Sequence, residues 1–264
     1  MVEMLSYEFM RRAFIVGSVL AIILPCIGFT ILLKRLSMMG DTLSHASLAG
    51  VSMGLFIGIN PLLGSIIICI MAGFFIELIS KKLKAYEEIS TVIVLASSIG
   101  LAGIFSSFNG NAASISSYLF GSIVTISNGE FYLILGVSSL VIIIYRLIYD
   151  RLYLCVFDLQ SAKLMGINTK LIDFIFTILA AVAISLSAKT IGSLIVSSIL
   201  VIPVITAMQL AKTYKEALIL SIILSVIFVY AGLIISYIFN LKPGSVIVII
   251  AVLALALTML FNRN

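Results

Sequence analysis

The segment Lys34–Gly58 carries the residue types in this chain that could bind or relay a cation. It holds the single histidine of the sequence, His45, and an acid, Asp41, four residues before it. Residues at positions i and i+4 lie one turn apart on the same face of an α-helix. A carboxylate and an imidazole stacked in this way could ligate a transition metal or relay a proton.

The surroundings of this pair predict a place inside a membrane. The neighbouring residues are apolar or small, and the segment is long enough to cross a bilayer. If the helix enters the bilayer at Ser37, Asp41 lies about 6 Å deep and His45 about 12 Å deep, at a rise of about 1.5 Å per residue. The centre of the hydrocarbon core is about 15 Å deep, and transporters place their substrate sites near that depth.

A packing role for the same two residues is the competing interpretation. Asp41 could cap the helix or accept a buried hydrogen bond, and His45 could be a satisfied packing residue. Placing an ionisable group inside a membrane costs about 2.5–3.5 kcal/mol. Because that cost falls on both residues, we favour a transport site. The small residues at every fourth position of Ala46–Gly58 predict close helix packing on one face.

Composition identifies the whole chain as a membrane protein. Of its 264 residues, 62% are hydrophobic and 10% are charged, against about 25% charged residues in soluble domains. We therefore expect one all-α domain over residues 1–264 that crosses the cell membrane many times and contacts lipid. The net charge of +5 fits basic cytoplasmic loops and gives no reason to expect nucleic-acid binding. The sequence has no GxxxxGKS/T motif, so we expect no P-loop ATP binding.

Hydropathy predicts eight or nine membrane-spanning helices. The expected spans are residues 13–33, 37–58, 62–79, 90–106, 131–148, 171–188, 191–210, 217–239 and 245–261. A tight turn at Lys189-Thr190 is expected between the sixth and seventh spans. The polar stretch Ser107–Gly129 separates the fourth span from the fifth, and we expect a short interfacial helix in it at Tyr118–Gly121.

Basic residues predict the orientation of these spans. They cluster in every second connection, at Lys34/Arg35, Lys81–Lys84, Arg146–Lys170 and Lys212/Lys215. Connections rich in lysine and arginine face the cytoplasm. Nine crossings then leave the N-terminus outside together with Arg11 and Arg12, against the same rule. Eight crossings, with one segment re-entrant or interfacial, is the alternative.

The polar connection Tyr149–Lys170 predicts a cytoplasmic docking element. Within it, Asp158 is suited to the N-cap of a short helix, and Gly166 is suited to its end. One apolar side of that helix is formed by Leu159, Ala162, Met165 and the neighbouring Leu164. Such a helix could dock on a partner protein or rest on lipid headgroups.

The run Arg35–Gly50, RLSMMGDTLSHASLAG, resembles the signature of the ABC-3 permeases. These proteins are the membrane subunits of zinc, manganese and iron ABC importers. Three further segments agree with the family in order and spacing: Tyr118–Gly121, Phe157–Gly166 and Gly192–Ala207. The resemblance covers most of the chain.

This resemblance implies the fold of a type II-like ABC importer permease that works as a homodimer. It implies two cytoplasmic ATP-binding subunits that hydrolyse ATP, so this chain is not itself expected to be an enzyme. It also implies an extracytoplasmic metal-binding protein that delivers the cargo. The short helix at Asp158–Gly166, with Ala162 in its middle, then resembles a coupling helix. Asp41 and His45 become candidate ligands of a transported divalent metal, and no permanently bound cofactor is expected.

Two other transport functions fit the same residues. A proton- or ion-coupled secondary transporter would use Asp41 and His45 as a relay, and inverted repeats would support it, but we find no convincing pair of matching halves. An ABC permease for a metal chelate is the second alternative, although the Asp/His pair would have no evident purpose there. Imidazole suits zinc, and carboxylate is acceptable to manganese and iron, so ligand softness does not select the metal.

Overall fold

The computed structural model of the protein describes residues 6–82, 87–109, 119, 121 and 127–261. Over these residues the chain forms nine long helices and one short helix, α8 (Leu159–Leu164). The long helices are α2 (Glu8–Leu33), α3 (Met38–Ile57), α4 (Pro61–Lys82), α5 (Glu87–Asn109), α7 (Asn128–Phe157), α9 (Thr169–Ile191), α10 (Ser193–Leu210), α11 (Tyr214–Phe239) and α12 (Pro243–Phe261). The predicted all-α bundle is confirmed, and the described residues form nine long helices where eight or nine membrane spans were predicted. The short helix expected at Tyr118–Gly121 lies mostly outside the described residues.

Seven of these helices are long and apolar enough to cross a membrane, namely α2, α4, α5, α7, α9, α11 and α12. α10 contributes a shorter apolar helix, Ile195–Leu210. α3, which carries Asp41 and His45, is not among the seven. Apolar helices therefore surround α3, which is more polar than they are. α3 is also the helix that was predicted to hold the site.

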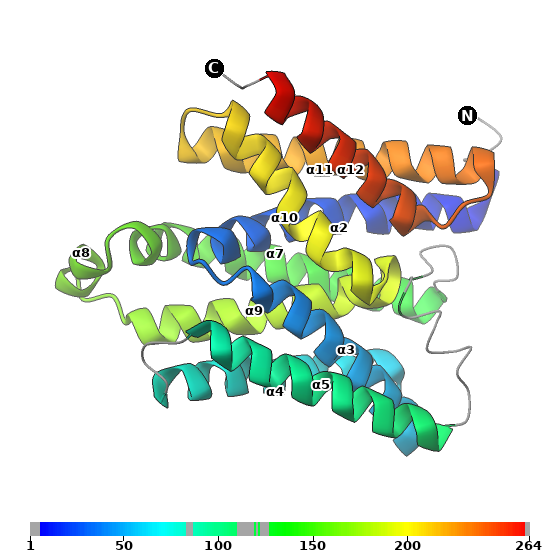
Figure 1. The fold of residues 1–264 in the computed structure, drawn as a ribbon, viewed down its shortest axis with the longest axis horizontal. Helices are drawn as coiled ribbons and strands as arrows, with labels where there is room; N and C mark the ends of the chain where they lie inside the picture. Colours follow the sequence, from blue (N-terminus) through cyan, green and yellow to red (C-terminus); the bar gives the residue numbers. More distant parts are fainter. Residues whose placement is uncertain (1–5, 83–86, 110–118, 120, 122–126, 262–264) are drawn as a thin grey trace.

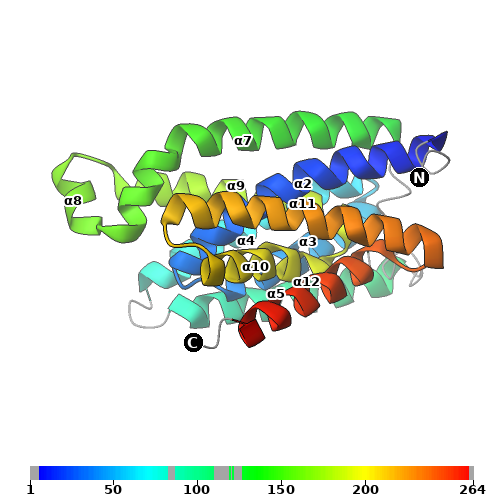
Figure 2. The same ribbon diagram turned by 90° about the horizontal axis from the view of Figure 1, so that it is seen from above.

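Consecutive long helices run in opposite directions, so their connections gather at two ends of the bundle (Figures 1 and 2). One end holds α8, the α2–α3 and α10–α11 connections and the end of α4, all of which carry basic residues. The other end holds the start of α2 and the α3–α4, α9–α10 and α11–α12 connections. The start of α2 and the end of α12 lie toward opposite ends, as an odd number of crossings requires. Arg12, at the end with few basic residues, forms an ion pair with Glu8, which offsets its charge.

α7 extends well beyond the predicted span of 131–148. It has 30 residues and is therefore about 45 Å long, against about 30 Å for a hydrocarbon core. The ring of Tyr214 packs against Tyr149, Tyr153 and Phe157, with ring centroids 4.8–6.1 Å apart. These contacts hold the extra helical turns to the start of α11, and α8 lies at the tip of the resulting projection (Figure 1).

Two ion pairs tie the ends of α9 to neighbouring helices. Asp173, near its start, pairs with Lys34 at the end of α2. Lys189, near its end, pairs with Glu130 in the first turn of α7. α9 is thereby held at both ends of the bundle.

The break between α9 and α10 falls later than predicted. The tight turn expected at Lys189-Thr190 is wrong, because both residues are helical and α9 continues to Ile191. The chain breaks at Gly192, whose φ is 112°. Residues with a side chain rarely adopt that conformation, so glycine suits this position.

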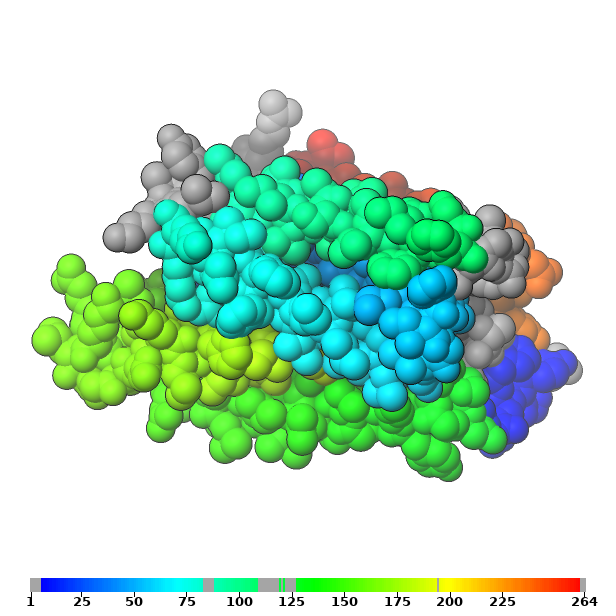
Figure 3. Space-filling view, turned by 90° about the horizontal axis from the view of Figure 1, so that it is seen from below, coloured from blue at the N-terminus to red at the C-terminus, as the bar shows by residue number. Residues whose placement is uncertain are grey.

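α3 runs through the interior of the bundle and packs against α4, α5, α9 and α10. α4 and α5 cover much of it on the face seen in Figure 3. The contact with α4 is backbone to backbone, because a Cβ added at Gly50 would lie 2.5 Å from the carbonyl oxygen of Gly64. The predicted packing role of the small-residue face is therefore seen directly.

Hydroxyl groups complete the contact of α3 with its neighbours. Ser47 Oγ lies 2.8 Å from Ser65 Oγ of α4, which lies 2.6 Å from Ser185 Oγ of α9. Thr42 donates to the carbonyl oxygen of Thr91 in α5 at 3.2 Å. All five residues are buried. Polar groups of α3 thus find partners inside the protein, as burial requires.

Replacing Gly50 with alanine should destabilise the bundle. The added Cβ would force α3 and α4 apart, at a cost of about 1–3 kcal/mol. The matched control is Gly100→Ala in α5, where a Cβ meets nothing within 4 Å and helix propensity improves by about 1 kcal/mol. Thermal stability of the detergent-purified protein, followed by size exclusion, should fall for Gly50→Ala and hold or rise for Gly100→Ala. Equal stability of the two variants would contradict the close contact.

The basic end of the bundle should face the cytoplasm. The test uses a protein whose three native cysteines are replaced. A single cysteine introduced as Gln160→Cys in α8 should resist a membrane-impermeant maleimide applied to intact cells. A cysteine introduced as Ile59→Cys, in the α3–α4 connection, should react. Labelling of position 160 but not position 59 would invert the orientation.

Candidate metal-binding site and coupling loop

Asp41 and His45 lie one turn apart on α3, and both are half-buried. The residues around them on the helix are fully enclosed. Those buried neighbours are Met39, Gly40, Thr42, Leu43, Ser44, Ala46 and Ser47. The two ionisable residues therefore share the strip of this helix segment that the single chain leaves partly open.

Asp41 does not cap α3, because the N-cap position belongs to Ser37. Its carboxylate accepts a hydrogen bond from Ser197 of α10, with 3.0 Å between Ser197 Oγ and Asp41 Oδ1. Asp41 lies in the first turn of α3, where the helix dipole favours a negative charge. No other hydrogen bond to this carboxylate is found among the described residues, so Oδ2 is available to a cation.

The ring of His45 makes no hydrogen bond to the described residues. A neutral imidazole presents one nitrogen lone pair and one N–H. The lone pair is a good ligand for a transition metal. His45 is therefore free to bind a cation from the same face of α3 as Asp41.

Asp41 and His45 are the two candidate metal ligands that the sequence analysis proposed for α3. In the part that the structure describes, no group of three or more His, Cys, Asp or Glu side chains is close enough to hold a metal ion. Cys69 lies behind α3 and is fully buried, and its thiol donates to the carbonyl oxygen of Leu43 at 3.2 Å. It acts as a packing residue that holds α4 to α3.

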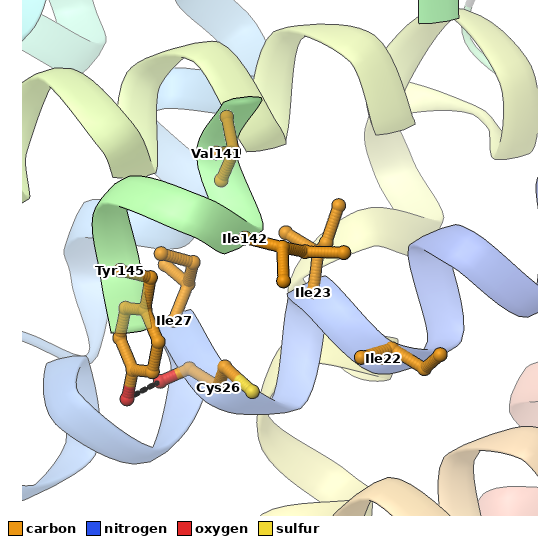
Figure 4. Close-up of a pocket in the computed structure, with 7 residues that line it drawn as sticks. All are labelled: Ile22, Ile23, Cys26, Ile27, Val141, Ile142 and Tyr145. Carbon is orange, nitrogen blue, oxygen red and sulfur yellow. Dashed lines mark hydrogen bonds between the residues drawn. The ribbon is translucent and has the colours of Figure 1, made fainter. Parts of the chain in front are cut away.

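A small pocket between α2 and α7 is apolar and offers no metal site (Figure 4). Its volume is about 40 Å³, and it is lined by Ile22, Ile23, Cys26, Ile27, Val141, Ile142 and Tyr145. The Tyr145 hydroxyl donates to the Cys26 carbonyl oxygen at 2.9 Å. That bond joins α2 to α7, and the pocket is a packing gap beside it.

The polar connection between α7 and α9 contains α8 and shows the expected ends. Asp158 Oδ1 accepts a hydrogen bond from the backbone N–H of Ser161 at 2.9 Å. Hydrogen bonds from the side chain and backbone of Ser161 hold the pKa of Asp158 below its ordinary value. Gly166 follows the helix with φ of 76°, the left-handed conformation that commonly ends helices. The N-cap and the stop predicted for these two residues are both seen.

Ala162 and the exposed apolar residues of this loop face different ways. Ala162 is fully buried against the rest of the chain. Leu164 is 88% exposed and Met165 is 67% exposed. The sequence pattern grouped Ala162 and Met165 on one side, and the structure separates them. The apolar surface that a partner could reach includes Leu159, Leu164 and Met165, and the last two are the most exposed.

Ser197 is the site residue that sequence reasoning missed. It belongs to the segment Gly192–Ala207, one of the three further segments that agree with the family in order and spacing. It is a half-buried serine in an apolar helix, six residues before Pro203. A hydroxyl at such a position was a weak signal, and its partner is 156 residues earlier in the chain.

Comparison with known proteins supports the same reading of the chain. The model of the ABC 3 transport family matches residues 6–262. The chain is 33% identical over 260 residues to a probable metal transport system membrane protein of Treponema pallidum, covering 98% of each chain. It is 26% identical over 258 residues to the manganese transport system membrane protein MntC of Listeria monocytogenes, covering 98% of this chain and 92% of the other.

The fold is also similar to a solved structure. PsaBC from Streptococcus pneumoniae, in complex with Fab, matches with a TM-score of 0.86 and 24% identity. The match covers 96% of this chain and 91% of that chain. The two proteins therefore share the arrangement of helices described above.

Proposed function

The chain belongs to the ABC 3 transport family, and on that premise we propose that it is the permease subunit of an ATP-driven importer of divalent transition-metal ions. It is a multi-pass protein of the cell membrane. The observation that carries the proposal is the pair Asp41 and His45, half-buried on an otherwise enclosed stretch of an interior helix. Burial of two ionisable groups in a membrane protein costs free energy. Such residues are therefore retained mainly where they serve a function.

Manganese is the first cargo to test, and zinc is the second. A carboxylate oxygen suits manganese and iron, and an imidazole nitrogen suits zinc. Relatives named as manganese transport or import proteins support manganese. The metal is a substrate here, since it must leave the site as readily as it enters.

A homodimer would complete the coordination of the metal. One chain supplies two ligands, which are too few for a four-coordinate site. In a two-fold dimer a residue near the axis occurs twice, so Asp41 and His45 of both chains would supply four. The partly open strip of α3 that carries the pair is consistent with a second chain covering it.

Each end of the bundle would bind a different partner protein. A separate cytoplasmic ATP-binding subunit would hydrolyse ATP, because this chain has no P-loop motif. The loop 149–170 would carry the coupling helix, with Asp158 and Gly166 shaping it and Ala162 holding it to the bundle. Leu164 and Met165 would enter a groove of the ATPase. An extracytoplasmic metal-binding protein would deliver cargo at the opposite end.

Asp41→Asn and His45→Ala should each abolish uptake of manganese or zinc. Asp41→Asn removes the negative charge of one ligand, His45→Ala removes the other ligand, and neither adds bulk, so folding and ATPase assembly should persist. The assay is uptake of radioactive metal by proteoliposomes that carry the permease, its ATPase and the loaded binding protein. Thr258→Ala, near the end of α12, is the control for loss of a polar side chain in a membrane helix and should keep wild-type uptake.

Wild-type uptake by both Asp41→Asn and His45→Ala would leave the two residues with a packing role. Uptake that continues without ATP and follows a proton gradient would instead favour the secondary transporter.

Leu164→Asp should weaken docking of the ATPase. An aspartate in place of a leucine that fills an apolar groove costs at least about 1.4 kcal/mol, or about tenfold in affinity. Leu241→Asp is the matched control, because Leu241 is also exposed but lies in the α11–α12 connection at the other end. Co-purification of the ATPase and stimulated ATP hydrolysis should drop for Leu164→Asp alone. Equal values for both variants would remove α8 from the coupling mechanism.

A further inference from the structure

We propose that Ser197 is a positioning residue for Asp41, holding one carboxylate oxygen so that the other is presented to the transported metal ion. The inference rests on the proposed function, since it assigns a role beside the same site. Its central observation is the 3.0 Å hydrogen bond from Ser197 Oγ to Asp41 Oδ1, which joins α10 to α3.

The backbone of α3 around Asp41 is fixed on the side away from Ser197. The Ser44 hydroxyl donates to the carbonyl oxygen of Asp41 at 2.8 Å. Thr42, the next residue, donates to Thr91 of α5, and Cys69 of α4 donates to the carbonyl oxygen of Leu43. What remains adjustable at Asp41 is the rotation of its side chain, which the bond from Ser197 restrains.

Packing of α10 brings Ser197 within reach of Asp41. Three residues further along, Leu200 lies between α2 and α3. A Cβ added at Gly28 would lie 1.9 Å from the carbonyl oxygen of Leu200, and one at Gly40 would lie 3.7 Å from its side chain. Gly40 is the residue before Asp41, so the contact that places α10 on the bundle also sets the distance across which the serine donates.

A serine hydroxyl suits this role chemically. It is small and neutral and donates to a carboxylate, so it orients Asp41 without supplying a positive charge that would compete with the metal. Partners that orient a ligating side chain commonly change metal affinity or activity by about 10–100-fold when removed. A lysine or arginine at position 197 would instead pair with the acid and exclude a cation.

The neighbouring serine supplies an internal comparison. Ser198 is half-buried, as Ser197 is, and both lie in the same turn of α10. No hydrogen bond of the Ser198 side chain is found within the described residues. A substitution at position 198 therefore repeats the loss of a hydroxyl from this helix turn without touching Asp41.

The experiment compares Ser197→Ala, Ser197→Thr and Ser198→Ala in proteoliposomes with the ATPase and the loaded binding protein. Initial uptake of radioactive manganese should fall about tenfold in Ser197→Ala. Ser197→Thr keeps the donor and should return uptake to within about threefold of wild type. Ser198→Ala should stay within about twofold. ATPase co-purification should be equal in all four proteins.

A second readout separates positioning from a purely structural tie between helices. Manganese depends on the carboxylate more than zinc does, because zinc is also well served by imidazole. Ser197→Ala should therefore lose more manganese uptake than zinc uptake. The binding protein is the same in every sample, so a change in this ratio reports on the permease.

Unchanged uptake by Ser197→Ala, while Asp41→Asn is inactive, would overturn this inference and leave the proposed function standing. Equal losses in Ser197→Ala and Ser197→Thr, with an unchanged metal ratio, would also overturn it, because they would mark Ser197 as a helix contact only. Wild-type uptake by Asp41→Asn would overturn the proposed function itself.

Discussion

The structure depends on burying a polar helix inside an apolar bundle. Lipid offers no hydrogen-bond partners, so the fully buried polar groups of α3 must be satisfied by the protein. Ser47 reaches Ser65 because Gly50 and Gly64 let α3 and α4 approach backbone to backbone. The small residues and the hydroxyl groups therefore act together. Close approach of the helices makes the polar contacts possible, and those contacts offset the cost of placing α3 inside the membrane protein.

Hydropathy could predict the helices because each is a run of apolar residues long enough to be recognised alone. It could not predict where tertiary contacts extend them. α7 continues past residue 148 because Tyr214 packs against its last turns. α9 includes Lys189 because Glu130 pairs with that lysine inside the bundle. Both errors occur where a residue distant in the sequence stabilises a turn that local composition disfavours.

The residues of the candidate site also fall into those that local sequence predicts and those that depend on tertiary contacts. Asp41 and His45 could be found because helical spacing and their rarity in an apolar segment are local properties. Ser197 could not, because its bond to Asp41 depends on how α10 packs against α2 and α3. The inward direction of Ala162 likewise depends on the contacts of α8 with α7 and α9. α8 has only six residues. The spacing of its apolar residues does not determine which side of α8 packs against α7 and α9.

The restraints on α3 are unequal, and the site lies on the weaker side. Toward α4 there is a backbone contact and a chain of buried hydroxyls, and separating these would leave polar groups unpaired at about 1–3 kcal/mol each. Toward α10 the polar link found among the described residues is the hydrogen bond from Ser197. A cation on the other carboxylate oxygen keeps Asp41 satisfied even if that bond is lost. No ion could replace the bond between Ser47 and Ser65 in the same way. If a cation binds Asp41 and His45 as proposed, the pair lies at a helix contact that could open without leaving a buried charge unpaired, which is what passage of a cation would require.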